Sequence, residues 1–363
     1  MSHLPINQQA MDATKKPVLS GRPFSRRRFL GAAAAFSWLP QFDRSGHADP
    51  RPTLDRKAEQ ETTLGKALIA ITLDLEMSRN FPTWEETHWD YEKGNLNEAA
   101  KAYTVEACRR VKAQGGVVHC FAVGRVFEHE NVDWLMDIVH EGHPVGNHTY
   151  DHVYVLARDP EELQFRFRRA PWLIHGKRPE EVIRENIVMT NLAIRDRLKV
   201  APAGFRTPGG FADGLAGRPD IQALLKDAGF SWVSSKYPAH KLSGKVGETP
   251  PKEDFAAIIE ALPMAQPFVY PNGLVEIPMS PISDINAFRT GRWPLAAFKE
   301  AIRQGIEWAI ERRAVFDFLA HPSCLGIVDP HFETIEMICD LVRKSQGRAA
   351  IVDLETIAQR TQT

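Results

Sequence analysis

The chain has 363 residues, 43% of them hydrophobic and 25% charged, which is enough to bury one large domain or two modest ones. Lysine and arginine together number 45 against 46 for aspartate and glutamate, a formal net charge of −1. Because phosphate binding requires a surplus of basic residues, this balance argues against a nucleic-acid-binding protein. The sequence gives no indication of the oligomeric state.

The N-terminal residues 1–48 predict an export signal and not a folded domain. Ser25-Arg26-Arg27-Arg28-Phe29-Leu30 precedes a mildly apolar run of small residues, a pattern that resembles a twin-arginine signal. The apolar run is too short to span a bilayer, so we expect no membrane span in the mature protein. Gly46-His47-Ala48 predicts cleavage before Asp49, and we expect a periplasmic or extracellular protein. A basic leader that is never exported is the alternative.

Residues 49–66 are polar and charged and are expected to form a linker, followed by one catalytic domain over 67–363. Within that domain, strand and helix patterns alternate along the chain. Apolar runs typical of buried strands occur at 67–74, 117–123, 143–147, 204–206, 230–233, 275–279, 316–320 and 350–352. Amphipathic periods predict helices at 96–113, 131–141, 179–198, 219–228, 294–312 and 332–344. The less regular residues 237–266 are expected to be an insertion. The repeated β–α order predicts an α/β barrel or a doubly wound sheet.

The four cysteines are expected to be free thiols in or near the core. Cys108, Cys120, Cys324 and Cys339 show no CxxC spacing, which argues against a zinc ribbon or a redox pair. A twin-arginine substrate folds before export in a reducing compartment, which argues against a disulfide framework. Cys324 follows His321 by three residues and is the one cysteine expected near a site.

Several charged and imidazole side chains follow the apolar runs of different predicted strands. They are Asp74, Glu76, His148, Arg206 and His321. The carboxyl ends of parallel strands meet at one edge of a sheet, so we expect these side chains to gather there. His148 and His152 are four residues apart, and on a helical backbone both imidazoles would share one face and could bind one divalent cation. Carboxylates, two histidines, an arginine and a late histidine are the parts that a metal-dependent hydrolase needs.

Four segments, in this order, resemble the motifs of the polysaccharide deacetylase family, the carbohydrate esterases of the fourth family. They are Thr72-Leu73-Asp74-Leu75-Glu76, His148-Thr149-Tyr150-Asp151-His152, Arg206-Thr207-Pro208-Gly209-Gly210 and Leu319-Ala320-His321. The resemblance runs from about Ala67 to Ile357 and implies a deformed (β/α)7-type barrel with parallel strands. It also implies a deacetylase, a hydrolase acting on carbon–nitrogen bonds other than peptide bonds. One divalent metal ion is implied with it: zinc, with cobalt, nickel or iron as alternatives.

The resemblance implies a metal site and a general base. Glu76, His148 and His152 would bind the metal, and Asp74 would take a proton from a metal-bound water. The commonest family pattern has two adjacent aspartates, whereas this chain has Asp74-Leu75-Glu76, a spacing also seen in peptidoglycan deacetylases and allantoinase-like amidohydrolases. Side chains alternate along a strand, so Asp74 and Glu76 would point to the same side. The reversed assignment, with Asp74 as the ligand, stays open.

The remaining motif residues receive roles by the same resemblance. Arg206 would hold the carboxylate of Asp74 and keep its pKa low, and His321 would protonate the departing amine or alcohol. Backbone N–H groups near Tyr237 would help to hold the oxyanion.

The expected substrate is an acylated carbohydrate, most simply an N-acetyl sugar. The acid-x-acid spacing keeps open the hydrolysis of a cyclic amide or imide in a small molecule. A catalytically inactive carbohydrate-binding domain is a further alternative. Aromatic and imidazole side chains after Glu76 would line the substrate cleft or form a packed loop: Trp84, His88, Trp89 and Tyr91.

Overall fold

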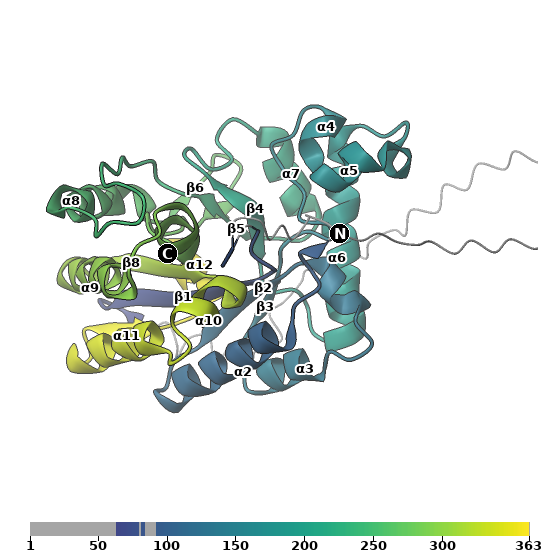
Figure 1. Cartoon of the computed structure of the whole chain (residues 1–363). Helices are drawn as coiled ribbons and strands as arrows, with labels where there is room; N and C mark the ends of the chain where they lie inside the picture. Colours follow the sequence, from purple (N-terminus) through teal and green to yellow (C-terminus); the bar gives the residue numbers. More distant parts are fainter. Residues whose placement is uncertain (1–62, 80, 84–91, 363) are drawn as a thin grey trace, which may run out of the picture. The chain divides into compact units, whose positions relative to one another are not determined.

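A computed structural model describes residues 63–79, 81–83 and 92–362 (Figure 1). The predicted export signal and the residues Trp84, His88, Trp89 and Tyr91 lie outside this part of the chain. Within the described ranges, no helix has both the length and the apolar composition that crossing a membrane requires.

A single curled sheet forms the centre of the fold. Its strands are β1 (Ala67–Leu75), β2 (Val118–Ala122), β3 (Val145–Asn147), β4 (Phe205–Phe211), β5 (Trp232–Lys236), β6 (Phe268–Val269), β7 (Val275–Glu276), β8 (Val315–Ala320) and β9 (Ala349–Ile351). The order along the sheet is β6-β7-β5-β4-β3-β2-β1-β8, and β9 pairs with the start of β1. All neighbours are parallel except β6 and β7, which are antiparallel.

Irregular backbone after β7 connects the two ends of the sheet. The Ser280 N–H donates to the carbonyl of Asp317 at 3.3 Å, and the Asp317 N–H donates to the Ser280 hydroxyl at 3.0 Å. An isolated parallel bridge joins Ser283 to Leu319. These contacts place the segment after β7 beside β8, as in a deformed (β/α) barrel, so the predicted fold class is confirmed.

Helices lie on the outside of the curled sheet (Figure 1). The α-helices are α2 (Glu98–Ala113), α3 (Asp133–His140), α4 (Pro160–Leu163), α5 (Phe165–Arg169), α6 (Pro179–Leu198), α7 (Pro219–Asp227), α8 (Lys252–Ala261), α9 (Leu295–Arg312), α10 (Pro322–Val328), α11 (Glu333–Lys344) and α12 (Leu354–Gln362). Short 3₁₀-helices are η2 (Gly124–Glu128), η3 (Pro171–Ile174) and η4 (Leu262–Ala265), and η5 (Ile285–Thr290) is a π-helix.

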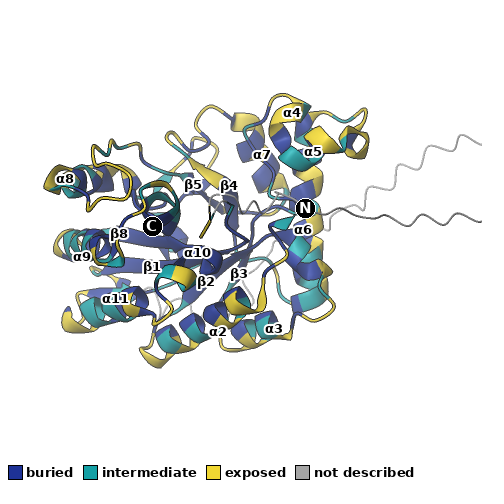
Figure 2. Ribbon diagram, in the orientation of Figure 1, coloured by how far each residue is buried: buried dark blue, intermediate teal, exposed yellow. Residues whose placement is uncertain are grey.

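Strand β1 shows how the sequence sorts side chains between the two faces of the sheet. Ile69, Ile71 and Leu73 point outward into a core shared with α2, α9 and α11. Leu68 and Ala70 point inward and pack with residues of other strands and of α12. Successive side chains of a strand alternate between faces, so Asp74 belongs to the inward set, at the carboxyl end of the strand. Figure 2 shows the strands as the most buried part of the fold.

Gly204, just before β4, permits a close approach that no other residue allows. Its φ is +76°, and a Cβ there would lie 1.9 Å from the indole of Trp232. Glycine adopts this backbone region without steric cost and leaves room for the ring. The close packing brings the start of β4, and with it Arg206, against β5.

The predicted strands and the long helices occur close to their predicted positions. The expected helix over 131–141 begins at Asp133, because Asn131 instead accepts a hydrogen bond from the Asp133 N–H at 2.7 Å. Residues 237–266 are less irregular than expected, since they contain α8 and η4. Elements that no pattern predicted are η2, α4, α5, η3, β6, η5, α10 and α12.

Candidate active site

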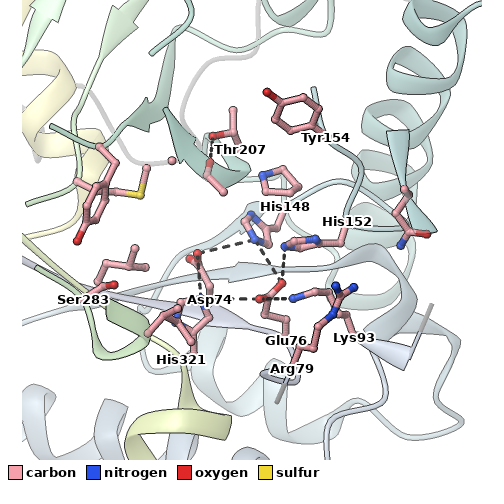
Figure 3. Close-up of a pocket in the computed structure, with 18 of the residues that line it drawn as sticks. Asp74, Glu76, Arg79, Lys93, His148, His152, Tyr154, Thr207, Ser283 and His321 are labelled. Atoms are coloured by element: carbon pink, nitrogen blue, oxygen red, sulfur yellow. Dashed lines mark hydrogen bonds and ion pairs between the residues drawn. The ribbon is translucent and has the colours of Figure 1, made fainter. Parts of the chain in front are cut away.

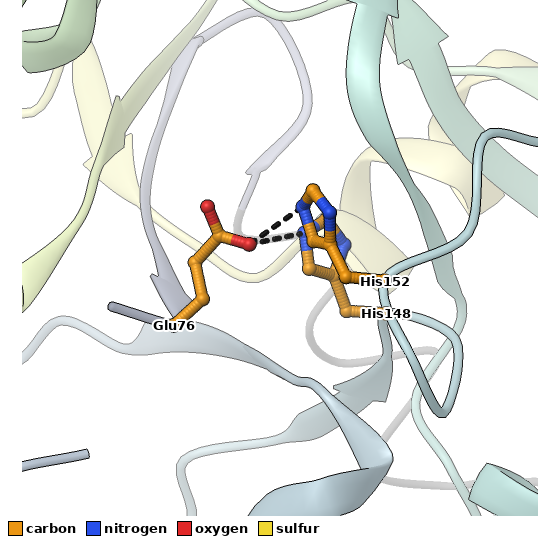
Figure 4. A group of neighbouring side chains, drawn as sticks. All are labelled: Glu76, His148 and His152. Atoms are coloured by element: carbon orange, nitrogen blue, oxygen red, sulfur yellow. Dashed lines mark ion pairs between the residues drawn. The ribbon is translucent and has the colours of Figure 1, made fainter. Parts of the chain in front are cut away.

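Glu76, His148 and His152 form a cluster at the carboxyl edge of the sheet (Figure 4). Glu76 directly follows β1, and His148 directly follows β3. One possible ligand atom from each residue lies within 4.8 Å of the others. Glu76 Oε2 is 2.6 Å from His152 Nε2 and 3.8 Å from His148 Nε2.

The two histidines do not lie on a helix, so the expected helical geometry of the pair is wrong. The backbone from His148 to His152 is an irregular loop, in which Thr149 has φ of 59° and His152 has φ of 57°. Non-glycine residues rarely adopt this left-handed region, and such strain is typical of functional sites. The convergence of the imidazoles therefore comes from a tightly turned loop.

Buried amide and hydroxyl side chains hold this loop in place. Asn147 Oδ1 accepts from the Thr149 N–H at 2.8 Å, and the Thr149 hydroxyl accepts from the Val153 N–H at 3.0 Å. Asn186, on α6, accepts from the Asp151 N–H at 2.7 Å. These bonds replace the helical hydrogen bonds that the spacing had suggested.

The donor atoms of the cluster fit a divalent metal ion. His148 Nδ1 lies 3.0 Å from the carbonyl oxygen of Arg206, which directs Nε2 toward the cluster as ligating histidines require. Glu76 Oε2 is buried and has no hydrogen-bond partner among the described residues, because its 2.6 Å approach to His152 lacks hydrogen-bond geometry. Two imidazoles and one carboxylate suit zinc, cobalt, nickel or iron.

Lys93 pairs with the other oxygen of Glu76. Its Nζ donates to Oε1 at 2.6 Å, and both side chains are buried. Burial alone would raise the pKa of Glu76, but the charges of His152 and Lys93 hold it well below its ordinary value. Burial lowers the pKa of His148 to about 4. The cluster therefore presents an ionised carboxylate and a neutral imidazole, the forms that bind a metal.

Asp74 lies beside the cluster (Figure 3) and pairs with a buried arginine. Its Oδ2 is 3.7 Å from His148 Nε2, and its Oδ1 accepts from Arg206 Nη1 at 3.2 Å. The fully buried guanidinium of Arg206 also pairs with Asp317 and stacks 4.5 Å from the ring centroid of Phe121. Arg206 thus connects two carboxylates. Only one of them, Asp74, was predicted from the sequence as a site residue.

His321 lies on the other side of the same carboxylates. Its Nε2 is 3.9 Å from Asp74 Oδ2 and 3.8 Å from Glu76 Oε1. Its Nδ1 lies 2.9 Å from Asp284 Oδ1, and its backbone N–H donates to Asp284 Oδ2 at 2.7 Å. Burial would lower the pKa of His321, but the charge and hydrogen bond of Asp284 outweigh burial and raise it.

The Tyr237 N–H donates to the carbonyl of Phe211 at 2.9 Å, so this N–H is not free to hold an oxyanion, contrary to the sequence-based expectation. All four cysteines are buried and free, as expected. Cys324 Sγ contacts the carbonyl of Asp284 at 3.9 Å, and burial raises the pKa of its thiol, which argues against a nucleophilic role.

These residues open into a cavity of about 790 Å³. The six site residues named from the sequence are brought together at its base: five of them line it or contact one another there, and Arg206 supports them from below. Further walls come from α4 and α5, β4 and the π-helix η5. Side chains on these walls are Tyr154, Glu162, Gln164, Phe165, Arg168, Asn286 and Arg289.

Three residues of the site were missed from the sequence. Asp317 had a usable signal, because a lone carboxylate in the apolar strand β8 must be paired when buried. Asp284 follows a predicted strand by a few residues, but no spacing connects it with His321. Lys93 lies in an irregular segment and had no signal at all.

Residues 90–231 match the model of the polysaccharide deacetylase family. This segment contains His148, His152 and Arg206, whereas Asp74 and His321 lie outside it. The comparison with curated proteins found no match.

Solved structures share the fold at low sequence identity. A protein of Mycobacterium smegmatis assigned to the polysaccharide deacetylases has a TM-score of 0.55 at 15% identity, over 82% of this chain and 91% of that chain. A probable polysaccharide deacetylase of Pseudomonas aeruginosa PAO1 has a TM-score of 0.55 at 14% identity, over 81% and 91%. The Puue allantoinase has a TM-score of 0.55 at 13% identity, over 86% and 97%. At these identities the similarity shows a common fold.

Proposed function

This chain belongs to the polysaccharide deacetylase family, hydrolases of carbon–nitrogen bonds other than peptide bonds, and we propose that it is a metal-dependent enzyme that removes an N-acetyl group from a carbohydrate. One observation carries the proposal. Glu76, His148 and His152 lie in a single cavity with Asp74 and His321, whose side chains approach the cluster at 3.7 and 3.8 Å, respectively. A metal site, a base and an acid thus surround one position.

Glu76, His148 and His152 would hold the metal, and this assignment favours Asp74 as the base. Of the two carboxylates, Glu76 has the oxygen that approaches both histidines, at 2.6 and 3.8 Å. Asp74 approaches His148 at 3.7 Å but forms no ion pair with His152, and it is engaged by Arg206. When bound there, a divalent cation polarises an acyl oxygen and makes water more acidic.

Asp74 would accept the proton of the attacking water. The guanidinium of Arg206 donates to its Oδ1 at 3.2 Å and fixes that oxygen, which leaves Oδ2 facing the cavity. Arg206 is fully buried and also donates hydrogen bonds to Asp317, Thr72 and Ser234. Its guanidinium is therefore held in place when the substrate moves. This rigid support keeps the base in one position.

His321 would donate a proton to the departing nitrogen. Asp284 binds its Nδ1, so that Nε2 carries the mobile proton and points to the cavity. The charge of Asp284 favours the protonated ring that an acid must have before the bond breaks. His321 and Asp74 would therefore exchange protons with the substrate from opposite sides.

The fold similarity to an allantoinase keeps small cyclic amides as the second candidate substrate, together with the Asp74-Leu75-Glu76 spacing. The test is acetate release from N-acetylglucosamine oligomers, assayed beside ring opening of cyclic imides, with the zinc-loaded wild type and Asp74→Asn. Acetate release that Asp74→Asn abolishes supports the proposal. Ring opening alone supports the cyclic amide. Sugar binding without any turnover indicates an inactive binding domain.

We also propose that the protein is exported by its twin-arginine-type leader, to the periplasm or beyond it. Ser25-Arg26-Arg27-Arg28-Phe29-Leu30 supports this proposal. Replacing Arg26 and Arg27 with lysine should trap the protein in the cytoplasm, as cell fractionation would show. Unchanged export of that variant would contradict the assignment.

A further inference from the structure

Arg289, on the π-helix η5, lines the catalytic cavity without a polar partner. It is half-buried and makes no hydrogen bond or ion pair with any residue that the structure describes. Eight other buried or half-buried arginines of the described chain have such a partner. They are Arg110, Arg125, Arg166, Arg197, Arg206, Arg218, Arg303 and Arg360.

The charges that line the cavity favour an anionic ligand. Four cationic side chains, Arg79, Lys93, Arg168 and Arg289, face three carboxylates, Asp74, Glu76 and Glu162. This is an excess of one positive charge, in a protein whose formal net charge is −1, and a divalent cation would add to it. Fields inside a cleft concentrate ligands of opposite charge.

Of these cations, Arg289 is the one that makes no hydrogen bond or ion pair within the described residues. Lys93 is bound to Glu76, and Arg168 Nε donates to the Glu161 carbonyl at 2.5 Å. A half-buried guanidinium without a partner has lost part of its hydration and regains it only through a ligand or water. Its planar donors match the two oxygens of a carboxylate.

The position of Arg289 ties this guanidinium to the acid–base machinery. Asp284, which holds His321, also caps η5 by accepting from the Ile285 N–H at 2.8 Å. The same short π-helix then presents Asn286 and Arg289 to the cavity. π-helical turns occur frequently at functional sites. An anion bound by Arg289 would therefore be held at a fixed position relative to His321.

We propose that Arg289 binds a carboxylate of the substrate, so that the preferred substrate is an acidic N-acetylated carbohydrate, such as one that contains a uronic acid. A single guanidinium matches one monoanionic group. This inference rests on the proposed deacetylase function and adds the class of sugar.

Kinetics with paired substrates test the proposal. One substrate is a tetrasaccharide of alternating glucuronic acid and N-acetylglucosamine, and the other is the neutral N-acetylglucosamine tetramer. For the zinc-loaded wild type, we expect kcat/KM to be at least about tenfold higher for the acidic substrate. This ratio corresponds to the binding free energy of one hydrogen-bonded contact between charged groups. Arg289→Gln should remove this preference by raising KM for the acidic substrate alone, and Arg289→Lys should retain part of it. Arg312→Gln, an exposed arginine paired with Glu311, is the matched control.

Calorimetric binding of both tetrasaccharides to the zinc-loaded wild type and Arg289→Gln separates this inference from the proposed function. Tighter binding of the acidic sugar that Arg289→Gln abolishes supports the subsite, even where no acetate is released. Equal binding and turnover of both sugars by the wild type would overturn it. So would an Arg289→Gln variant that loses both sugars to the same extent.

Discussion

Asp284 accepts two hydrogen bonds from His321, one from the ring Nδ1 at 2.9 Å and one from the backbone N–H at 2.7 Å. Both oxygens of one carboxylate thus fix both the position and the ring orientation of one histidine. His321 Nε2 is left facing the cavity, 3.9 Å from Asp74. In the proposed mechanism, Asp284 would therefore decide how well His321 acts as the acid.

Replacing Asp284 with asparagine should weaken the acid and leave the metal site in place. Because the carboxylate raises the pKa of His321, its removal lowers that pKa, and the ring loses its proton at a lower pH. We expect kcat to fall by about 10²-fold and the basic limb of the pH–rate profile to move to lower pH. Metal content, measured on the same sample, should not change. An unshifted basic limb would contradict the assigned role of His321.

Replacing Lys93 with methionine should make the protein more dependent on metal. The change leaves the buried carboxylate of Glu76 without its ammonium partner, and the metal-free protein should lose about 3 kcal/mol of unfolding free energy. A bound divalent cation compensates the same charge, so zinc should stabilise Lys93→Met more than it stabilises the wild type. Urea unfolding with and without zinc measures both effects, with Lys93→Arg as the control. Equal stabilisation of the two proteins would show that Lys93 and the metal site are independent.

Replacing Arg206 with methionine should destabilise the fold as well as abolish activity. Two buried carboxylates, Asp74 and Asp317, would lose their common partner, at a cost of about 3–5 kcal/mol. Adding Asp317→Asn to this variant should recover part of the loss, because one unpaired charge is removed. Chemical denaturation of the single and double variants measures the recovery. A loss below about 1 kcal/mol in Arg206→Met would contradict the network.

His143, in the connection that leads into β3, should contribute to the loss of stability at acidic pH. Burial lowers its pKa from 6.5 to about 4, and its Nδ1 accepts from the Val118 N–H at 2.9 Å. The unfolded chain binds the proton first, so the stability from neutral His143 is present above pH 6.5 and is lost as the pH falls toward 4. His143→Gln should reduce the loss of unfolding free energy between pH 6.5 and pH 4 by about 2 kcal/mol. The exposed His175→Gln is the control, and identical pH slopes in His143→Gln and wild type would refute the prediction.

The sequence predicted the framework well because long apolar runs bounded by glycine and polar residues are unambiguous. The strand that ends at Asp74 and the helix Pro179–Leu198 are of this kind. Residues 160–174 were missed, since they form short helices with too few turns to show a period. Parallel strands also explain why residues as distant as Asp74 and His321 could be expected at one edge.

The fine geometry of the site could not be predicted. The left-handed backbone of Thr149 and His152 has no sequence signature, and it replaces the helix that the spacing of the histidines suggested. Lys93 and Asp284 lie on irregular segments, where contacts depend on the whole fold. Site residues on strands were therefore predictable, and their supporting partners were not.

The most direct test of the metal-dependent account is metal content measured together with acetate release on the same preparations. The samples are the full chain, wild type, against His148→Ala/His152→Ala, with His175→Ala as the control. We predict one equivalent of divalent metal per chain in the wild type, lost in the double variant together with acetate release from acetylated glucosamine oligomers. A wild type that binds no metal after reconstitution with zinc, or a double variant that keeps both metal and activity, would contradict the account.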